Sequence, residues 1–407
     1  MTNSPSILGA VSTYRRLLRA EITSGLRKPA LGIYDHNLHL IGGGQKYGCT
    51  IAHALQDEFD ITLIANHPVT RRQLSGWYGL DLSRVGLKVI PIAGFGSSSG
   101  SHIDPASLTR SQANPFQLVS RDSVRYDFFL NNGMNELVYP LSNMSFVMCH
   151  FPERRPSQYF YLDRYSQILY NSLYTAKWIR QRWKVEPDQL IYPPVNMDPP
   201  DDGHKRRQII LSVARFERGG SKKQVEMIQA FSKLKQNFPV PMKSWKMVVA
   251  GGSHQHNEYL ETVYQLLESL GTSDIDVQVD LSGEEIRDLY GEAMIFWHLC
   301  GLDETDPALV EHFGMSVAEA MQCGVVPIVY RGGGMTEIVE DESSGYTVQN
   351  TAGLLRKTLD LIERPALLNK LSEAAMVRSQ RFNLQRFKIQ VQEYFRSKLE
   401  RYSSVSN

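Results

Sequence analysis

The sequence predicts an α/β fold built from two doubly wound, Rossmann-like domains. Residues 31–65 are typical of strand, glycine loop, helix and strand, which is the order of a βαβ unit with a parallel sheet. A proline-rich stretch at 193–203 interrupts the chain, and a second alternation of strands and helices follows it. The length of 407 residues suits two domains of ordinary size.

The first half contains the elements of one such domain. Its opening βαβ unit has strands at Leu31–Tyr34 and Asp60–Ala65, and a helix at Gln45–Leu55. The stretch 94–116 is rich in Gly, Ser, Asn and Pro, and it predicts a long surface loop. Further strands are expected at Asp127–Leu130, Ser145–Cys149 and Ile168–Tyr170.

The second half repeats the pattern. We expect strands at Gln208–Val213, Lys246–Ala250, Ile295–Leu299 and Val325–Tyr330. We expect helices at Lys222–Leu234, Ser316–Gln322, Leu354–Glu363 and Phe387–Arg401. The chain should therefore divide into an amphipathic segment (1–30), a first domain (31–200), a second domain (201–385) and a final helix (386–407).

Composition and charge narrow the class of protein. The formal net charge of +1 argues against a uniformly basic surface for nucleic acid. No apolar run reaches the roughly 18 residues of a membrane span, and the beginning lacks the pattern of a secretory signal. Four cysteines form no CxxC pair and are expected to be free buried thiols: Cys49, Cys149, Cys300 and Cys323. We therefore expect a cytoplasmic protein.

The segment Ser6–Lys28 has apolar residues at helical spacing and several basic residues beside them. Such a helix can lie on an anionic membrane, here at its inner face, as a peripheral contact. It can equally pack on the surface of the protein itself. The sequence leaves both interpretations open.

The richest stretch for chemistry runs from Glu311 to Met321. Two carboxylates, Glu311 and Glu319, stand eight positions apart around a loop that opens a helix. The N–H groups at a helix start suit a phosphate, and Glu319 could accept hydrogen bonds from sugar or ribose hydroxyls. A structural alternative is a capping box, in which Ser316 caps the helix and Glu319 reaches back to it.

The surrounding residues carry a resemblance. Glu311-His312-Phe313-Gly314 is followed by Glu319-Ala320-Met321, Val326-Pro327, Gly333-Gly334 and Glu337-Ile338-Val339. This run resembles family 4 of the retaining GT-B glycosyltransferases, also called group 1. The resemblance extends from about Gly32 to Ser397 and is strongest in the second half. It implies a GT-B fold with two Rossmann-like domains facing a central cleft, and a final helix that returns to the first domain.

By this resemblance, Glu311 should contact the transferred sugar near the reacting face. Phe313, Gly314 and Met315 should offer backbone N–H groups to the sugar and diphosphate, and Glu319 should bind the ribose. Arg215 and a lysine at the next helix start should hold the diphosphate, as their charges would also favour. That lysine is Lys222 or Lys223, because the insertion Gly219-Gly220-Ser221 lengthens the loop.

Two features of the first domain also match this family. Gly42-Gly43-Gly44 corresponds to its glycine loop, where small residues let the backbone approach a ligand. His150, followed by Phe151-Pro152, corresponds to a histidine near the acceptor cleft. Each could also be structural, as a tight turn or a strand-end histidine. The glycine run is not GxGxxG, and Asn66-His67 supply no acid for a dinucleotide ribose.

The resemblance implies transfer of a hexose-type sugar from a nucleoside-diphosphate sugar to a glycan or lipid-linked acceptor, in cell-surface polysaccharide or glycolipid synthesis. Arg215, Lys222 and the helix dipole at Met315 would stabilise the leaving phosphate. We expect no metal and no other cofactor, because no acidic pair suitable for a metal site stands out. A sugar-nucleotide epimerase, a pyridoxal-phosphate-dependent phosphorylase and a non-catalytic glycan-binding relative are the alternatives.

Overall fold

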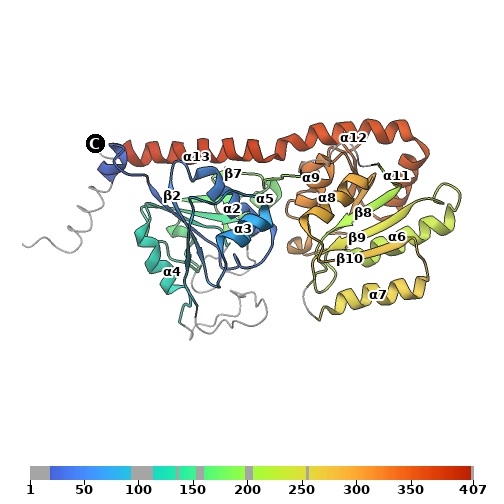
Figure 1. The fold of residues 1–407 in the computed structure, drawn as a ribbon, viewed down its shortest axis with the longest axis horizontal. Helices are drawn as coiled ribbons and strands as arrows, with labels where there is room; N and C mark the ends of the chain where they lie inside the picture. Colours follow the sequence, from blue (N-terminus) through green and yellow to red (C-terminus); the bar gives the residue numbers. More distant parts are fainter. Residues whose placement is uncertain are drawn as a thin grey trace, which may run out of the picture. The chain divides into compact units, whose positions relative to one another are not determined.

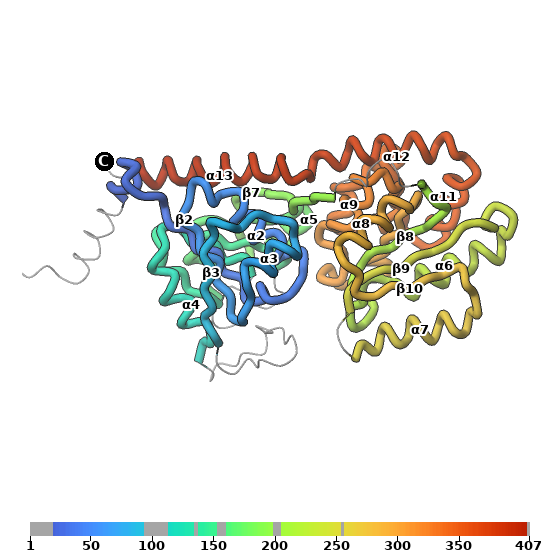
Figure 2. Tube along the Cα trace, viewed as in Figure 1, coloured from blue at the N-terminus to red at the C-terminus, as the bar shows by residue number. Residues whose placement is uncertain are grey.

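The computed structural model describes residues 19–92, 113–133, 137–152, 160–197, 205–253 and 256–404. The predictions for residues 1–18, for most of the loop 94–116 and for the linker residues 198–203 lie outside these ranges. The chain forms two compact units (Figures 1 and 2). The first comprises Met1–Asn171, Ala176–Tyr192 and Phe387–Asn407, and the second comprises Ser172–Thr175 and Pro193–Arg386.

The first unit is built on a parallel sheet with the order β3-β2-β1-β4-β5-β6-β7. Its strands are β1 (Ala30–Tyr34), β2 (Asp60–Ala65), β3 (Gly86–Val89), β4 (Phe128–Asn131), β5 (Met144–Cys149), β6 (Gln167–Tyr170) and β7 (Gln189–Leu190). Strand β1 pairs with both β2 and β4, so the chain order reverses beside it. This strand order is that of a doubly wound Rossmann-like domain.

The helices of this part of the chain are α2 (Gly43–Leu55), α3 (Arg71–Tyr78), α4 (Gln117–Asp122) and α5 (Leu173–Trp183). Helix α13 (Leu384–Ser404, red in Figure 1) begins in the second unit, and its residues from Phe387 onward belong to the first. Its buried side chains Phe387, Val391 and Phe395 join the core of the first sheet. Their spacing of four residues places them on one face of the helix.

The second unit repeats the design with a parallel sheet in the order β10-β9-β8-β11-β12-β13. Its strands are β8 (Ile209–Val213), β9 (Lys246–Gly251), β10 (Ile275–Val279), β11 (Ile295–His298), β12 (Val326–Tyr330) and β13 (Tyr346–Val348). Its helices are α6 (Gln224–Asn237), α7 (Glu258–Leu270), α8 (Gly283–Glu292), α9 (Met315–Gln322), α10 (Met335–Ile338), α11 (Thr351–Glu363) and α12 (Pro365–Ser379).

The predicted fold class is confirmed, since both units are doubly wound α/β domains with parallel sheets. The units divide at Pro193, whereas the sequence placed the end of the first domain at residue 200. Two backbone contacts explain the difference. The N–H of Val195 bonds to Phe382 O at 2.9 Å, and that of Met197 bonds to Gln322 Oε1 at 2.8 Å. Both partners lie in the second unit.

All four cysteines are buried thiols outside any disulfide, as predicted. Within the described ranges, no helix combines the length and the apolar character needed to cross a membrane.

Candidate active site

The best candidate site lies at the carboxyl end of the second sheet, where its strand order reverses between β8 and β11. Ligands of doubly wound domains bind at such a switch point. Arg215 follows β8 by two residues, and β11 ends at His298, two residues before Cys300. The chain brings Glu311 to the same place by the loop between β11 and α9.

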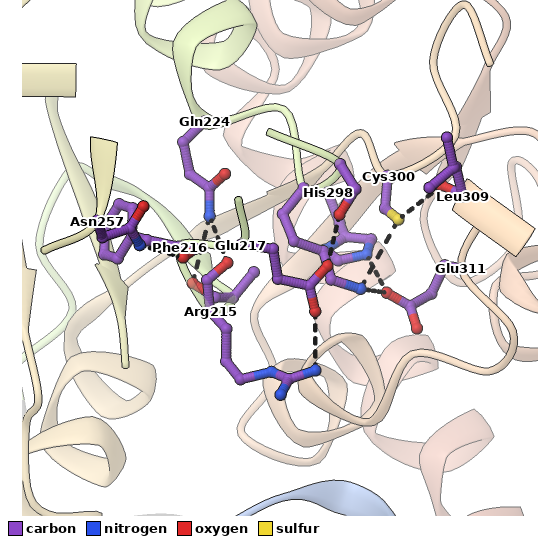
Figure 3. A network of polar contacts seen from close by, with 12 residues as sticks. Arg215, Phe216, Glu217, Gln224, Asn257, His298, Cys300, Leu309 and Glu311 are labelled. Carbon is purple, nitrogen blue, oxygen red and sulfur yellow. Dashed lines mark hydrogen bonds and ion pairs between the residues drawn. The ribbon is translucent and has the colours of Figure 1, made fainter. Parts of the chain in front are cut away.

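A lysine and a glutamate form the centre of this site, and Figure 3 shows the glutamate, Glu311, beside His298 and Cys300. Lys222 Nζ lies 2.9 Å from Glu311 Oε2, and the side chains are only 18% and 17% exposed. His298 Nε2 lies 3.0 Å from the same carboxylate oxygen, and the Cys300 thiol lies 3.7 Å from the Lys222 ammonium. Two of the predicted catalytic residues, far apart in the sequence, are therefore direct partners.

The pair is held in its charged form. Burial alone would raise the pKa of Glu311, but Lys222 and His298 outweigh it, and that pKa lies well below its usual value. Burial would likewise lower the pKa of Lys222, but the nearby Glu311 carboxylate raises it above its usual value. Burial and then Glu311 raise the pKa of the Cys300 thiol to about 12, so this thiol is protonated at neutral pH.

The structure separates Lys222 from Lys223. Lys223 is the N-cap of α6 and has a left-handed backbone with φ of 62°. Its ammonium lies 2.6 Å from Glu304 and 3.8 Å from Glu226, while Lys222 alone of the two contacts Glu311. A side chain in the left-handed region is strained, and glycine would adopt this conformation without strain.

Arg215 is held in place through its backbone. Gln224 donates from Nε2 to Ala214 O at 3.3 Å and to Arg215 O at 3.1 Å. On the other side, a Cβ on Gly251 would lie only 1.9 Å from Ala214 O, so β9 packs directly on this turn. The guanidinium is 61% exposed and bonds to Glu217 at 2.8 Å, whose other oxygen accepts from Ser221 Oγ (Figure 3).

Two glycines that follow β12 hold the backbone of Glu311. The N–H of Gly334 bonds to Glu311 O at 2.8 Å. A Cβ on Gly333, whose φ is +59°, would lie 2.0 Å from the same carbonyl oxygen, and a Cβ on Gly334 would lie 2.4 Å from His312 O. These glycines are therefore required because the backbone that carries Glu311 lies directly against them.

We expect Gly333→Ala to lower the free energy of unfolding by about 2–3 kcal/mol, through the overlap and the left-handed backbone together. Gly219→Ala is the matched control, because Gly219 also has a positive φ of 83° but nothing lies within 4 Å of its added Cβ. Urea denaturation of the two variants measures the difference. Equal losses would show that the contact with Glu311 O is unimportant.

Helix α9 starts beside Glu311. Gly314 is its N-cap with φ of 106°, Met315 is its first residue, and the buried Phe313 stacks edge-on against Phe382 at 5.4 Å. The capping-box alternative is wrong, because the helix starts at Met315 and has no side-chain cap. No acidic side chain of the first turn of α9 therefore covers the N-terminal end of the helix, where the helix dipole is positive. An anion site at a helix start requires this end to be open.

Glu319 lies one turn further along α9. Its Oε2 accepts a hydrogen bond of 3.4 Å from the Tyr290 hydroxyl, which also bonds to Ser316 O at 3.2 Å. Tyr290 is fully buried at the end of α8, so Glu319 is linked to the core of the second unit.

The first unit has its own polar cluster at the carboxyl ends of β1, β4 and β5. Asp35 follows β1 and is 2% exposed, and its carboxylate accepts from Asn132 Nδ2 at 2.8 Å and from Gln45 Nε2 at 3.3 Å. Burial raises the pKa of Asp35 and lowers that of His150, which follows β5. A Cβ on Gly44 would lie 3.4 Å from His150 Nε2, so this glycine loop packs against the histidine.

The other glycines of this loop have simpler roles. Gly42 is the N-cap of α2 with an extended backbone, and Gly43 is the first residue of the helix. The structure thus places Gly42, Gly43, Gly44 and His150 together in the first unit, and the remaining predicted residues in the second.

Sequence reasoning missed several residues of both clusters. His298 was placed only within an expected strand and Cys300 only among the buried thiols, although their spacing of two at a strand end places both side chains on one side. Asp35 carried a similar signal, since it directly follows the first strand. Asn132 and Gln224 had no signal, because their roles are hydrogen bonds to distant backbone and side-chain groups.

The chain is similar to known glycosyltransferases. Residues 198–378 match the family described as glycosyl transferases group 1. The chain is 25% identical over 253 residues to the GDP-Man:Man(3)GlcNAc(2)-PP-Dol alpha-1,2-mannosyltransferase of Dictyostelium discoideum, covering 56% of this chain and 46% of that protein. It is 27% identical over 213 residues to the alpha-1,3/1,6-mannosyltransferase ALG2 of Rhizomucor pusillus, covering 44% and 45%. The chain thus spans less than half the length of these relatives.

Solved structures show the same fold. Anabaena Alr3699/HepE in complex with UDP and glucose superposes with a TM-score of 0.66 at 18% identity, covering 91% of this chain and all of that one. Sucrose-phosphate synthase from Thermosynechococcus elongatus gives 0.69 at 16% identity, covering 92% and 100%. These likenesses show that the chain has the GT-B fold. The match of residues 198–378 to glycosyl transferases group 1 agrees with the resemblance in the sequence.

Proposed function

We propose that this glycosyltransferase moves a hexose-type sugar from a nucleoside-diphosphate sugar to a glycan or lipid-linked acceptor, with retention at the anomeric carbon. The buried Lys222–Glu311 pair beside the start of α9 is the observation that supports it best. In this proposal the pair would supply a cation for the diphosphate and a carboxylate for the sugar at one switch point of the sheet.

The charges suit the chemistry of such a transfer. As the bond to the anomeric carbon breaks, negative charge grows on the departing diphosphate and positive charge on the sugar. Lys222, Arg215 and the positive end of α9 would stabilise the diphosphate. The Glu311 carboxylate would face the sugar. Retention follows if the acceptor attacks from the face that the diphosphate leaves, with a phosphate oxygen taking the acceptor proton.

The first unit would supply the acceptor side. His150 lies beside the glycine loop and the buried Asp35, and its lowered pKa keeps the imidazole neutral at pH 7. A neutral imidazole can accept or donate a hydrogen bond to a sugar hydroxyl. We propose this contact for His150.

Glu319 is proposed to bind the ribose, and because it does not cap α9 its removal should separate binding from stability. We expect Glu319→Ala to weaken nucleotide binding by roughly tenfold, since a hydrogen bond to a charged group contributes about 1.5–3 kcal/mol. Glu319→Gln should lose less, because the amide still accepts a hydrogen bond. Calorimetry with the nucleoside diphosphate and thermal melts of both variants test this. Unchanged affinity in Glu319→Ala would exclude the ribose contact.

Transfer should not need a metal ion, because Lys222, Arg215 and the start of α9 already offer positive charge to the diphosphate. We expect full activity after dialysis against EDTA. The measurement compares initial rates with EDTA, with Mg²⁺ and with Mn²⁺. A loss in EDTA that either ion restores would contradict the proposal.

The donor and acceptor can be found in two steps. The Dictyostelium relative is named for GDP-Man, and structures of Anabaena HepE contain UDP and glucose or UDP-glucose. Thermal melts with GDP-mannose, UDP-glucose and UDP-N-acetylglucosamine should therefore identify the base and sugar that stabilise the protein. The stabilising donor is then incubated with and without polyprenyl-diphosphate-linked oligosaccharides or free glycans.

Transfer to an acceptor, with the donor's anomeric configuration kept in the NMR spectrum of the product, is the expected result. Conversion of the donor to an epimer without acceptor would instead show a sugar-nucleotide epimerase. Binding of glycan without turnover of any donor would show a non-catalytic relative. Inversion at the anomeric carbon would contradict the retaining mechanism alone.

A further inference from the structure

Three side chains of different chemistry converge at the end of β11. His298, Cys300 and Glu311 offer a nitrogen, a sulfur and an oxygen that all lie within 4.8 Å of one another. His298 and Cys300 are 1% and 2% exposed, so two of the three come from the rigid core of the second unit. Such a set is found at metal sites, where three protein ligands leave a fourth position open.

The nitrogen and oxygen of this set are near the separation expected around a bound ion. Ligand atoms of a tetrahedral zinc site are about 3.3–3.7 Å apart, given bonds of roughly 2.0–2.3 Å. His298 Nε2 and Glu311 Oε2 are already 3.0 Å apart. His298 Nδ1 is buried without a hydrogen-bond partner in the described part of the chain. In the absence of a metal the Glu311 carboxylate accepts the proton of Nε2 in a hydrogen bond. A metal at Nε2 would replace this hydrogen bond, and the ring proton would then lie on Nδ1.

A positively charged side chain of the protein already lies among these three ligand atoms. The Lys222 ammonium lies 2.9 Å from Glu311 Oε2 and 3.7 Å from Cys300 Sγ, so it contacts two of the three ligand atoms. The cluster is therefore a cation site that the chain fills with its own side chain. A metal ion that binds there must displace this ammonium, because the two charges would repel each other at such short distance.

We propose that His298, Cys300 and Glu311 form a binding site for Zn²⁺ that competes with the ammonium of Lys222. Zn²⁺ fits because nitrogen, thiolate and carboxylate ligands suit a borderline-soft ion, whereas Mg²⁺ requires oxygen ligands. On binding, Cys300 forms a sulfur–zinc bond and loses its proton to the solvent. Displaced Lys222 no longer reaches the diphosphate, so zinc inhibits donor binding; this last step rests on the proposed function.

The test is direct zinc binding to the full-length protein. Each variant is titrated with ZnCl₂ in competition with a chromophoric zinc chelator. MgCl₂ serves as the control for a divalent cation that should not bind. Lys222→Ala removes the competing cation and should bind zinc at least about tenfold more tightly than the wild type. Adding Cys300→Ser to that variant should abolish the gain. If Lys222→Ala binds zinc no more tightly, the competition does not exist.

Two matched controls exclude nonspecific effects. Lys223→Ala removes the neighbouring lysine, which pairs with Glu304 instead, and should leave zinc affinity at the wild-type value. Cys323→Ser, added to Lys222→Ala, removes another buried thiol of the second unit and should leave the tight binding intact. A loss of binding with Cys323→Ser that equals the loss with Cys300→Ser would overturn the assignment of ligands.

The consequence for the donor is measured separately. In the wild type, saturating ZnCl₂ should weaken binding of the nucleoside diphosphate at least fivefold, and EDTA should reverse the effect. If zinc binds with the expected dependence on Lys222 and Cys300 but diphosphate affinity does not change, the metal site stands. In that case the proposed contact between Lys222 and the diphosphate is wrong.

Discussion

Glu311→Gln should lower turnover by one to two orders of magnitude, because the carboxylate that faces the sugar loses its charge. A charge-assisted interaction contributes about 1.5–3 kcal/mol, and each 1.36 kcal/mol is tenfold in rate. The structure adds a second consequence that the sequence did not indicate. Glu311 is the counter-charge of a buried Lys222, so the variant should also lose stability. Removing one partner of a buried ion pair typically costs about 3–5 kcal/mol.

The pH dependence of stability checks this interpretation. The pKa of Glu311 is lowered in the folded state, so its contribution to stability is complete above about pH 4.5 and is lost as the pH falls through the folded value. The pKa of Lys222 is raised, so its contribution is complete below about pH 10.5 and is lost only at more alkaline pH. The stability difference between wild type and Glu311→Gln should therefore be greatest around neutral pH and shrink in acid.

The chain offers a matched control in Glu304→Gln. Glu304 is also largely buried, at 20% exposure, and lies 2.6 Å from Lys223 in the neighbouring ion pair. We expect this variant to lose some stability and to turn over within threefold of the wild type. Stopped assays measure the turnover of both variants, and denaturation curves measure their stability. Normal turnover of Glu311→Gln, or an equal loss in Glu304→Gln, would remove Glu311 from the reaction.

Much of the fold could be predicted because its strands are short apolar runs between glycine and proline signals. Strand β2 was predicted with its observed bounds, and β8, β9 and β12 within one residue. Helix α7 was not predicted, although its apolar residues recur at helical spacing, and Val263 is its one buried residue. Strand β10 was also missed, since it lies at the edge of the sheet with only Ile275 buried.

The site was less predictable than the fold. The motif around Glu311 identified the stretch that carries it, but partners such as His298 and Lys222 are set by how loops meet at the end of the sheet. Spacing along the chain cannot give such contacts. The capping box considered for Ser316 and Glu319 is the opposite case, a feature that the sequence pattern offered and the structure does not have. A local pattern matched, but Gly314 starts the helix two residues earlier because the loop packs against Met335.

Lys222→Ala should weaken binding of the nucleoside-diphosphate donor by roughly ten- to a hundredfold. The ammonium is buried next to Glu311 and α9, where loss of a charge-assisted contact with phosphate is worth about 1.5–3 kcal/mol. Arg215→Ala should have a smaller effect, because its guanidinium is 61% exposed and its interactions are screened by water. The ranking of the two variants is therefore part of the prediction.

Lys223→Ala is the control that separates the two adjacent lysines. Lys223 is bound to Glu304 and Glu226 and has a strained backbone, so its replacement should leave donor affinity within about threefold. Lys223→Gly should be more stable than Lys223→Ala, because glycine adopts a φ of 62° without strain. Calorimetry with the nucleoside diphosphate ranks the three positions. If Lys223→Ala loses more affinity than Lys222→Ala, the diphosphate lies at the Glu304 side of the loop, and the ion pair with Glu311 serves stability alone.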